Sequence, residues 1–290
     1  MGARLGRWIC AALAALPGLV AAAPPADEYS FAELDGHRIR YFDRGTPGAK
    51  EALVFVHGWS CDASFWKASA GPLSSKYRTI AIDLPGHGGS DRPPIAYTMD
   101  LYAQAIDAVL RAAKVDGAVL IGHSNGTPAI RQFYRKFPEK TRALVIVDGP
   151  LRPFGDRASM EKFISRFKGP GYEQAAGKMI DGMTSSIADA QLREQIRSAM
   201  LATPQAVALS EFESTLDARI WAPDKITVPV LMVLAKQPAW NAEYEEWVRG
   251  LVPDLEYQVW EGVSHFLMME QPERFNAALV AFLEKHNLPK

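Results

Sequence analysis

The segment Ala118-Val119-Leu120-Ile121-Gly122-His123-Ser124-Asn125-Gly126 decides the fold of this chain. It joins a short apolar run, typical of a buried strand, to a pattern typical of a helix. A glycine two residues away on each side of Ser124 leaves room for the strand and the helix to approach each other. The pattern predicts a strained left-handed turn that lifts the serine hydroxyl above a sheet. Ser124 is therefore the candidate nucleophile.

Short β-rich runs and helical patterns alternate on both sides of this turn. Strands are expected at residues 29–34, 38–42, 52–56, 79–83, 118–121, 143–147, 230–234 and 257–260. Continuous apolar strands separated by helices indicate a mostly parallel sheet with helices on both faces. The sequence therefore predicts an α/β fold.

Residues 151–222 break this alternation. They show helical patterns at 160–167, 173–183 and 188–200 and no strand pattern. Such a long helical insertion exceeds what a connection between strands needs. We expect a helical cap over the carboxyl ends of the strands, with 24–150 and 223–290 forming the core. Apolar side chains of the cap, most of them expected to pack on the sheet and a minority to line a pocket, include Met160, Phe163, Met179, Met183 and Met200.

Composition narrows the class of protein. The 290 residues carry a formal net charge of -1, and 48% of them are hydrophobic. This is a globular composition with no basic excess that would favour nucleic acid or an anionic membrane as a partner. A small-molecule substrate is the expected partner, and the sequence leaves the oligomeric state open.

The N-terminus resembles a targeting segment. Arg4 and Arg7 precede the apolar run 8–20, and small residues follow through Ala23. This order predicts a signal peptide at 1–23, a periplasmic or secreted protein, and no stable membrane association after cleavage. A retained anchor is the alternative. Because Cys10 lies in the predicted signal, Cys61 would be the single thiol of the mature chain, which excludes an internal disulfide.

Two further motifs supply partners for Ser124. His265 follows the last predicted strand, where a loop can bring an imidazole to the serine as a general base. His57-Gly58-Trp59 ends the 52–56 strand. The backbone amides of Trp59 and Asn125 are the candidate donors of an oxyanion hole. A plain tight turn at His57-Gly58 is the alternative interpretation.

Together these motifs resemble the α/β-hydrolase superfamily, in its capped serine hydrolase and esterase branch. The resemblance rests on Val56-His57-Gly58-Trp59, on Ile82 through Ser90, on Gly122 through Gly126, and on Gly262-Val263-Ser264-His265 followed by Glu270-Gln271-Pro272. It implies a doubly wound sheet of about eight strands, with the cap inserted after the sixth. It also implies that Asp83 is structural, although its carboxylate is a tempting candidate acid.

The third member of the catalytic triad departs from the common pattern. Most relatives carry an aspartate after the strand that precedes the last one, but no carboxylate occurs at 235–241 here. By resemblance to dehalogenase-like members and some lactonases, Asp148 at the end of the 143–147 strand is the candidate. Glu243 is the next candidate, and a structural role for Asp148 in its turn is the alternative.

The predicted reaction is hydrolysis of a carboxylic ester or lactone through an acyl-enzyme, without metal or organic cofactor. Carbon–carbon bond hydrolysis, acyl transfer and non-catalytic binding of a small molecule remain open on the same scaffold. Four residues are candidates for contact with an apolar substrate: His57, Phe154, Trp240 and Phe266.

Overall fold

The computed structural model describes Gly2 and residues 29–289 of the chain. Apart from Gly2, the predicted signal peptide at 1–23 lies outside the described residues. Within the described part, no helix combines the length and apolar character needed to cross a bilayer.

An eight-stranded sheet forms the centre of the molecule, with the strand order β1-β2-β4-β3-β5-β6-β7-β8. Its strands are β1 (Tyr29–Leu34), β2 (His37–Arg44), β3 (Glu51–Val56), β4 (Thr79–Ile82), β5 (Gly117–His123), β6 (Thr141–Val147), β7 (Val230–Ala235) and β8 (Leu255–Trp260). Only the β1–β2 hairpin is antiparallel to its neighbours, and β3 to β8 pair in parallel. The predicted α/β class and mostly parallel sheet are confirmed.

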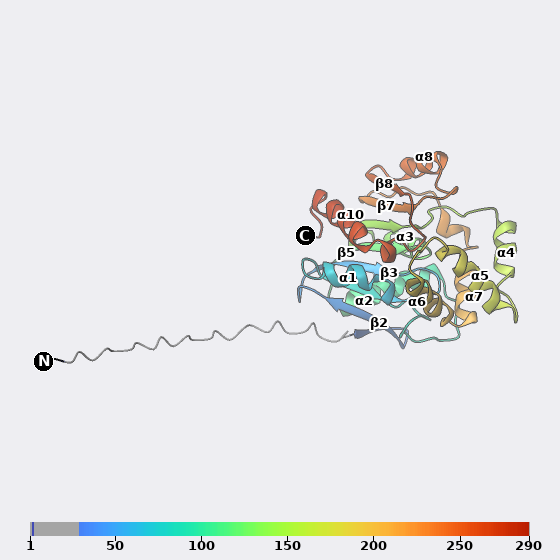
Figure 1. The fold of residues 1–290 in the computed structure, drawn as a ribbon, viewed down its shortest axis with the longest axis horizontal. Helices are drawn as coiled ribbons and strands as arrows, with labels where there is room; N and C mark the ends of the chain where they lie inside the picture. Colours follow the sequence, from blue (N-terminus) through green and yellow to red (C-terminus); the bar gives the residue numbers. More distant parts are fainter. Residues whose placement is uncertain (1, 3–28, 290) are drawn as a thin grey trace.

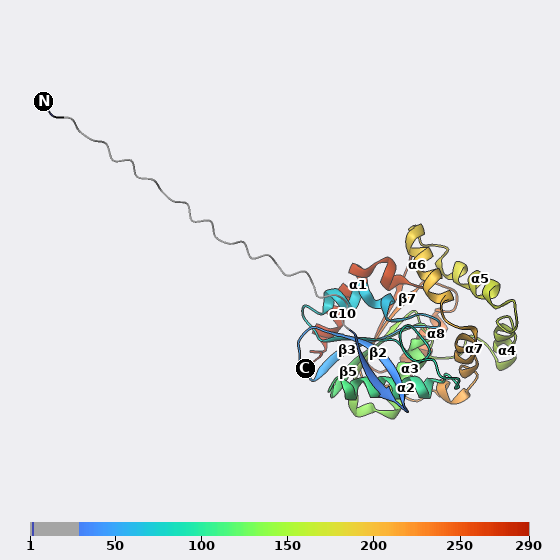
Figure 2. The same cartoon turned by 90° about the horizontal axis from the view of Figure 1, so that it is seen from below.

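Helices cover both faces of the sheet (Figures 1 and 2). In Figure 2, α1 and α10 lie on one side of the strands, and α2 and α3 lie on the other. The helices of the core are α1 (Lys67–Leu73), α2 (Met99–Ala112), α3 (Gly126–Lys136), α8 (Ala242–Leu251), α9 (Leu267–Glu270) and α10 (Pro272–Lys285). The central strands β3 to β7 are apolar on both sides because each side faces a helical layer.

The alternation along β3 shows how one strand serves both layers. Val54 and Val56 belong to the cluster that includes α2, α3 and α8. Leu53 and Phe55 belong to the opposite cluster, which includes α1 and α10. All four side chains are fully buried.

The cap consists of α4 (Arg157–Ser165), α5 (Tyr172–Thr184), α6 (Ala190–Leu201) and α7 (Gln205–Ser214), inserted between β6 and β7. Three of these helices overlap the predicted stretches, whereas α7 was not predicted. Figures 1 and 2 both show the cap helices gathered at one end of the sheet. The cap therefore stands over the edge at which the parallel strands end.

Strand register brings the turns after β5 and β6 together at that edge. His123 pairs with Val147 across β5 and β6, and Val147 pairs with Val233 across β6 and β7. Ser124 and Asp148 each follow a residue of the first pair. Two side chains distant in sequence are thus placed on neighbouring strand ends.

Candidate active site

Ser124 occupies the sharp turn between β5 and α3. Its φ of 50° is left-handed, which is rare for a residue with a side chain and costs about 1–3 kcal/mol. Two backbone hydrogen bonds hold the turn: the Ser124 amide donates to the Val147 carbonyl (2.9 Å), and the Thr127 amide donates to the Ser124 carbonyl (3.0 Å). The strain is therefore maintained by the surrounding sheet and helix.

The two glycines around Ser124 are required by close backbone contact. A Cβ on Gly122 would lie 2.7 Å from the Gly126 carbonyl oxygen. A Cβ on Gly126 would lie 2.6 Å from the His57 carbonyl oxygen. No side chain fits at either position without moving backbone.

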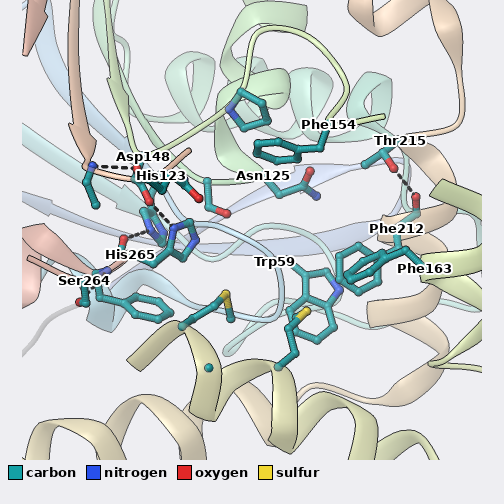
Figure 3. Close-up of a pocket in the computed structure, with 18 of the residues that line it drawn as sticks. Trp59, His123, Asn125, Asp148, Phe154, Phe163, Phe212, Thr215, Ser264 and His265 are labelled. Carbon is teal, nitrogen blue, oxygen red and sulfur yellow. Dashed lines mark hydrogen bonds and ion pairs between the residues drawn. The ribbon is translucent and has the colours of Figure 1, made fainter. Parts of the chain in front are cut away.

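His265 and Asp148 form a hydrogen-bonded pair beside this turn (Figure 3). His265 Nδ1 lies 2.6 Å from Asp148 Oδ2. His265 stands on the loop after β8, and Asp148 follows β6. Such a bond fixes the imidazole with its hydrogen on Nδ1 and leaves Nε2 available to accept a proton.

The environment of Asp148 also orients its carboxylate. The other oxygen, Oδ1, accepts from the Ala235 amide and from Trp240 Nε1, each at 2.9 Å. The side chain is 2% exposed. The Asp148 φ of 42° is again left-handed. Three hydrogen bonds thus hold one buried carboxylate toward His265.

Glu243, the other candidate acid, lies elsewhere. It stands in the first turn of α8, and its side chain is 76% exposed. Its carboxylate contacts the Arg152 guanidinium at 3.2 Å. Within the described chain, Asp148 is the carboxylate bonded to His265.

The backbone amides of Trp59 and Asn125 flank the nucleophile turn. Within residues 29–289, neither amide donates to a protein acceptor. The Trp59 indole donates to the Ala208 carbonyl of α7 at 2.8 Å and stacks on Phe212 at 4.4 Å. These contacts fix the Trp59 backbone while leaving its amide free for a ligand.

A cavity of about 730 Å³ lies between the cap and the strand ends, and Ser124, His265 and Asp148 are among its lining residues. Figure 3 shows Asp148 and His265 on one side of this cavity and Trp59, Phe163 and Phe212 on the other. The cap side of the lining includes Met160, Phe163, Met179, Met183, Met200 and Phe212. All five cap side chains named from the sequence therefore line the cavity, more than the expected minority.

Two of the four predicted substrate contacts have other partners in the structure. His57 and Trp240 lie outside the cavity lining. His57 Nε2 accepts from the Leu84 amide at 3.0 Å, and Nδ1 lies 2.8 Å from the Gly58 carbonyl. Trp240 donates its indole hydrogen to Asp148 and so helps to orient that carboxylate. Both residues hold site loops in place.

The other two predicted contacts, Phe154 and Phe266, do line the cavity. Phe154 is 68% exposed and packs on Trp240 at 5.5 Å. Phe266 is fully buried and lies 5.2 Å from the His265 ring. Phe154 is thus at the exposed rim of the cavity, and Phe266 lies beside the His265 imidazole.

Burial lowers the pKa of two histidines around the site. Desolvation, together with the neighbouring His87, lowers the pKa of His57 from 6.5 to about 4. Desolvation and then His265 lower the pKa of His123 well below its usual value. His123 Nε2 lies 2.9 Å from the His265 carbonyl, so its neutral ring braces the loop that carries the base.

The Asp83 carboxylate holds its loop in place through contacts with neighbouring segments. It accepts from the Ala63 amide at 2.8 Å and the Gly89 amide at 2.9 Å, and it pairs with Arg40. None of these contacts reaches His265. This is the arrangement that the resemblance implies for Asp83.

Glu211 was not identified from the sequence. It lies in α7, is 1% exposed, and accepts from the Asn125 side chain at 2.7 Å. A glutamate in a helical stretch is typical of a solvated face, so the sequence carried no signal for a buried one. No group of three or more potential metal ligands occurs among the described residues.

The parallel sheet, the strained serine turn and the inserted cap define an α/β hydrolase. A model of the alpha/beta hydrolase family matches residues 53–278, most of the chain, so the chain belongs to this family.

Three comparisons show how this chain stands within the family. It is 31% identical to the non-heme chloroperoxidase of Streptomyces lividans over 278 residues, which cover 86% of this chain and 97% of that one. It is 32% identical over 143 residues to an acetyltransferase component of the acetoin cleaving system from Cupriavidus necator, covering 48% of this chain and 37% of that longer protein. A solved structure titled "Est816 as an N-Acyl homoserine lactone degrading enzyme" is similar at 25% identity and a TM-score of 0.73, covering 87% of this chain and 100% of the other.

Proposed function

We propose that the protein hydrolyses a carboxylic ester or lactone of a small, uncharged and largely apolar substrate. The observation that carries the proposal is the hydrogen-bonded pair of His265 and Asp148 in the same cavity as the strained Ser124. A nucleophile, a base and an orienting acid are the parts that acyl transfer needs.

In the first half of the proposed reaction, His265 Nε2 accepts the Ser124 proton as Oγ attacks the substrate carbonyl carbon. The carbonyl oxygen becomes an oxyanion that accepts from the Trp59 and Asn125 amides. His265, now an imidazolium stabilised by Asp148, gives its proton to the leaving alkoxide. The products are an acyl-enzyme and an alcohol. In a lactone, this alcohol stays attached to the acyl group.

In the second half, His265 removes a proton from water, and the resulting hydroxide attacks the acyl carbon. The second tetrahedral intermediate collapses and returns the proton to Ser124 Oγ. The carboxylic acid then leaves the cavity.

The lining of the cavity supports an uncharged substrate. Within the described chain, Lys236 and Asp148 are the Lys, Arg, Asp or Glu side chains that line it. Lys236 pairs with Glu261 and is 65% exposed, so it belongs to the rim. The methionines and aromatic rings of the cap favour apolar groups because burial of apolar surface drives their binding.

The test is hydrolysis of p-nitrophenyl esters over a series of acyl lengths, beside N-acyl homoserine lactones of matched length. Ser124→Ala should abolish turnover with the fold intact, and the preferred length reports the size of the cavity. A folded wild-type protein that turned over neither class would contradict the proposal.

Three alternatives use the same scaffold. Carbon–carbon hydrolysis would show as cleavage of a diketone without ester turnover, and acyl transfer as ester formation when an alcohol is added. A protein that only binds its ligand need not react with a fluorophosphonate. An activated Ser124 becomes labelled by that reagent, so labelling separates an enzyme from a binding protein.

We also propose export, which rests on the leader pattern at 1–23 alone. Expression of the full chain in a Gram-negative host, followed by N-terminal sequencing, tests it. A periplasmic protein that begins near Pro24 is expected, and an uncleaved membrane-bound chain would identify an anchor.

A further inference from the structure

A buried carboxylate links the cap to the nucleophile turn. Glu211 of α7 is 1% exposed, yet Arg and Lys are not among its contacts within the described residues. Its Oε1 accepts from Asn125 Nδ2 at 2.7 Å. Asn125 directly follows Ser124 and is the N-cap residue of α3, and its side chain makes no hydrogen bond to that helix. The cap therefore binds the residue next to the nucleophile.

His87 approaches the other oxygen of the same carboxylate. His87 Nε2 lies 3.3 Å from Glu211 Oε2, and both side chains are buried. His87 Nδ1 lies 3.0 Å from the Pro85 carbonyl and so carries a hydrogen. A hydrogen bond between Nε2 and Oε2 then needs one proton, on either atom. Neither atom has a hydrogen-bond partner among the described residues, so the 3.3 Å approach of the imidazole is what this buried carboxylate oxygen faces on the core side.

We infer that Glu211 is a positioning residue for the oxyanion hole: it holds the Asn125 side chain, and thereby the Asn125 amide, in the orientation that the transition state requires. This inference rests on the proposed function and assigns part of the catalytic geometry to the cap. A docked cap then completes the site as well as enclosing it.

The physical reason lies in what Asn125 would do without an acceptor. A short amide side chain readily bonds to nearby backbone groups in turns, in competition with the local structure. Asn125 has φ −66° and ψ −12°, next to the strained Ser124. A new bond from its side chain would rotate the peptide whose N–H faces the oxyanion. A small misplacement of such a donor lowers the rate of the chemical step rather than substrate binding.

The central variants are Glu211→Ala and Glu211→Gln, assayed on the ester that wild type prefers. Glu211→Ala should lower kcat about 10- to 100-fold with KM within about threefold of wild type. Glu211→Gln should restore most of kcat, because its oxygen can accept from Asn125 and its amide can donate to His87 Nε2. Failure of this rescue would overturn the inference.

Ser210→Ala is the matched control. Ser210 lies beside Glu211 in α7, and its hydroxyl accepts from the Tyr97 amide of the core at 2.8 Å. Its loss removes a contact between cap and core without touching Asn125. It should lower the melting temperature and leave kcat near that of wild type. A kcat loss equal to that of Glu211→Ala would show that general loosening of the cap is responsible, against the inference.

Two reactivity measurements separate failure of this inference from failure of the proposed function. Inhibition by an alkyl trifluoromethyl ketone, which adds to the serine to form a tetrahedral oxyanion, should weaken in Glu211→Ala in parallel with kcat/KM. The fluorophosphonate labelling rate should fall as well. If wild type is active and labelled, unchanged inhibition and labelling in Glu211→Ala overturn this inference alone. If wild type neither hydrolyses esters nor becomes labelled, both proposals fail.

Discussion

The hydrogen bonds of Asp148 divide its two oxygens between distinct tasks. Oδ1 accepts two hydrogens, from Ala235 and Trp240, while Oδ2 faces His265. An asparagine at this position would have to place its oxygen where Oδ1 lies. Its NH₂ would then point at His265 Nδ1 and force the imidazole hydrogen onto Nε2.

Asp148→Asn should therefore keep the fold but lower kcat by about 10⁴-fold, because Nε2 can no longer accept the serine proton. Ester turnover and the melting temperature, measured together, check this prediction. Glu243→Gln is the control, since Glu243 is exposed and bonded to Arg152, and it should be as active as wild type. If Glu243→Gln were inactive and Asp148→Asn active, Glu243 in α8 would be the acid of the triad.

Because the pKa of His57 is lowered in the fold, the free energy of unfolding should depend on pH. Its pKa is about 4 in the folded protein and 6.5 for an ordinary histidine. Between these values the unfolded chain binds a proton that the folded chain does not. Neutral His57 therefore contributes about 3 kcal/mol to the free energy of unfolding. This contribution is fully present above pH 6.5 and is lost as the pH falls to about 4.

His57→Gln provides the measurement. The free energy of unfolding in urea, followed from pH 6.5 to about 4, should rise less steeply with pH in the variant. The difference should be close to one proton, or about 1.4 kcal/mol per pH unit. Identical slopes for the two proteins would show that His57 titrates normally in the fold.

At the residue scale, local motifs could be predicted and long-range partners could not. Ser124 and His265 stand in short patterns whose geometry is set by the adjacent strand. Glu211 joins Asn125 across 86 positions, and nothing beside it in sequence marks it as buried. Trp240 was expected to contact the substrate because aromatic rings often line pockets. In the structure its indole N–H donates to the Asp148 carboxylate.

At the scale of elements, the close contact between α3 and the end of β3 depends on Gly126. Gly126→Ala would place a methyl group against the Val56 and His57 carbonyl oxygens, at 2.7 and 2.6 Å. The helix must then move away from the sheet, at a cost of about 1–3 kcal/mol in the free energy of unfolding. Activity should fall further, because Ser124 stands in the same turn. Urea denaturation and ester turnover measure the two effects.

Gly250→Ala in α8 is the comparison for that substitution. No atom lies within 4 Å of the added methyl group, and the position is exposed. Alanine in place of a helical glycine should stabilise the protein by about 0.5–1 kcal/mol. If both variants behaved alike, helix propensity rather than close approach would decide the Gly126 result.

Elements whose apolar pattern is strong were predicted well. All eight strands appear within two residues of their expected ends. The central strands β3 to β7 are largely continuous apolar runs, whereas β1, β2 and β8 mix polar and apolar residues. Helix α7 was missed, since its residues alternate small, polar and apolar types without one clear face. Its position is determined by contacts such as Phe212 on Trp59, which belong to the tertiary structure.

At the scale of the whole molecule, the single thiol of the predicted mature chain reports global opening. Cys61 is 2% exposed, and burial raises its pKa well above the usual value. In a protein that begins at Pro24, dithionitrobenzoate should react only as fast as the molecule unfolds. Reductant should leave the melting temperature unchanged, because one thiol cannot form an internal disulfide.

Labelling of Cys61 at rising urea concentrations checks this prediction. The rate should increase in step with the unfolded fraction. Fast labelling in native buffer would instead reveal that the cap opens far enough to expose the cavity, in which Cys61 is a lining residue.

The position of Asp148 before the cap has a consequence for how such a protein can be diversified. None of Ser124, Asp148 and His265 belongs to the excursion from 151 to 222, so the chemistry and the insert are encoded separately. A chimera could exchange this insert for a foreign one and keep the proposed nucleophile, acid and base. The graft must still bring a buried acceptor to Asn125 and replace the α7 contacts that hold Trp59. Substrate range is thus open to recombination, provided that these contacts are inherited with the insert.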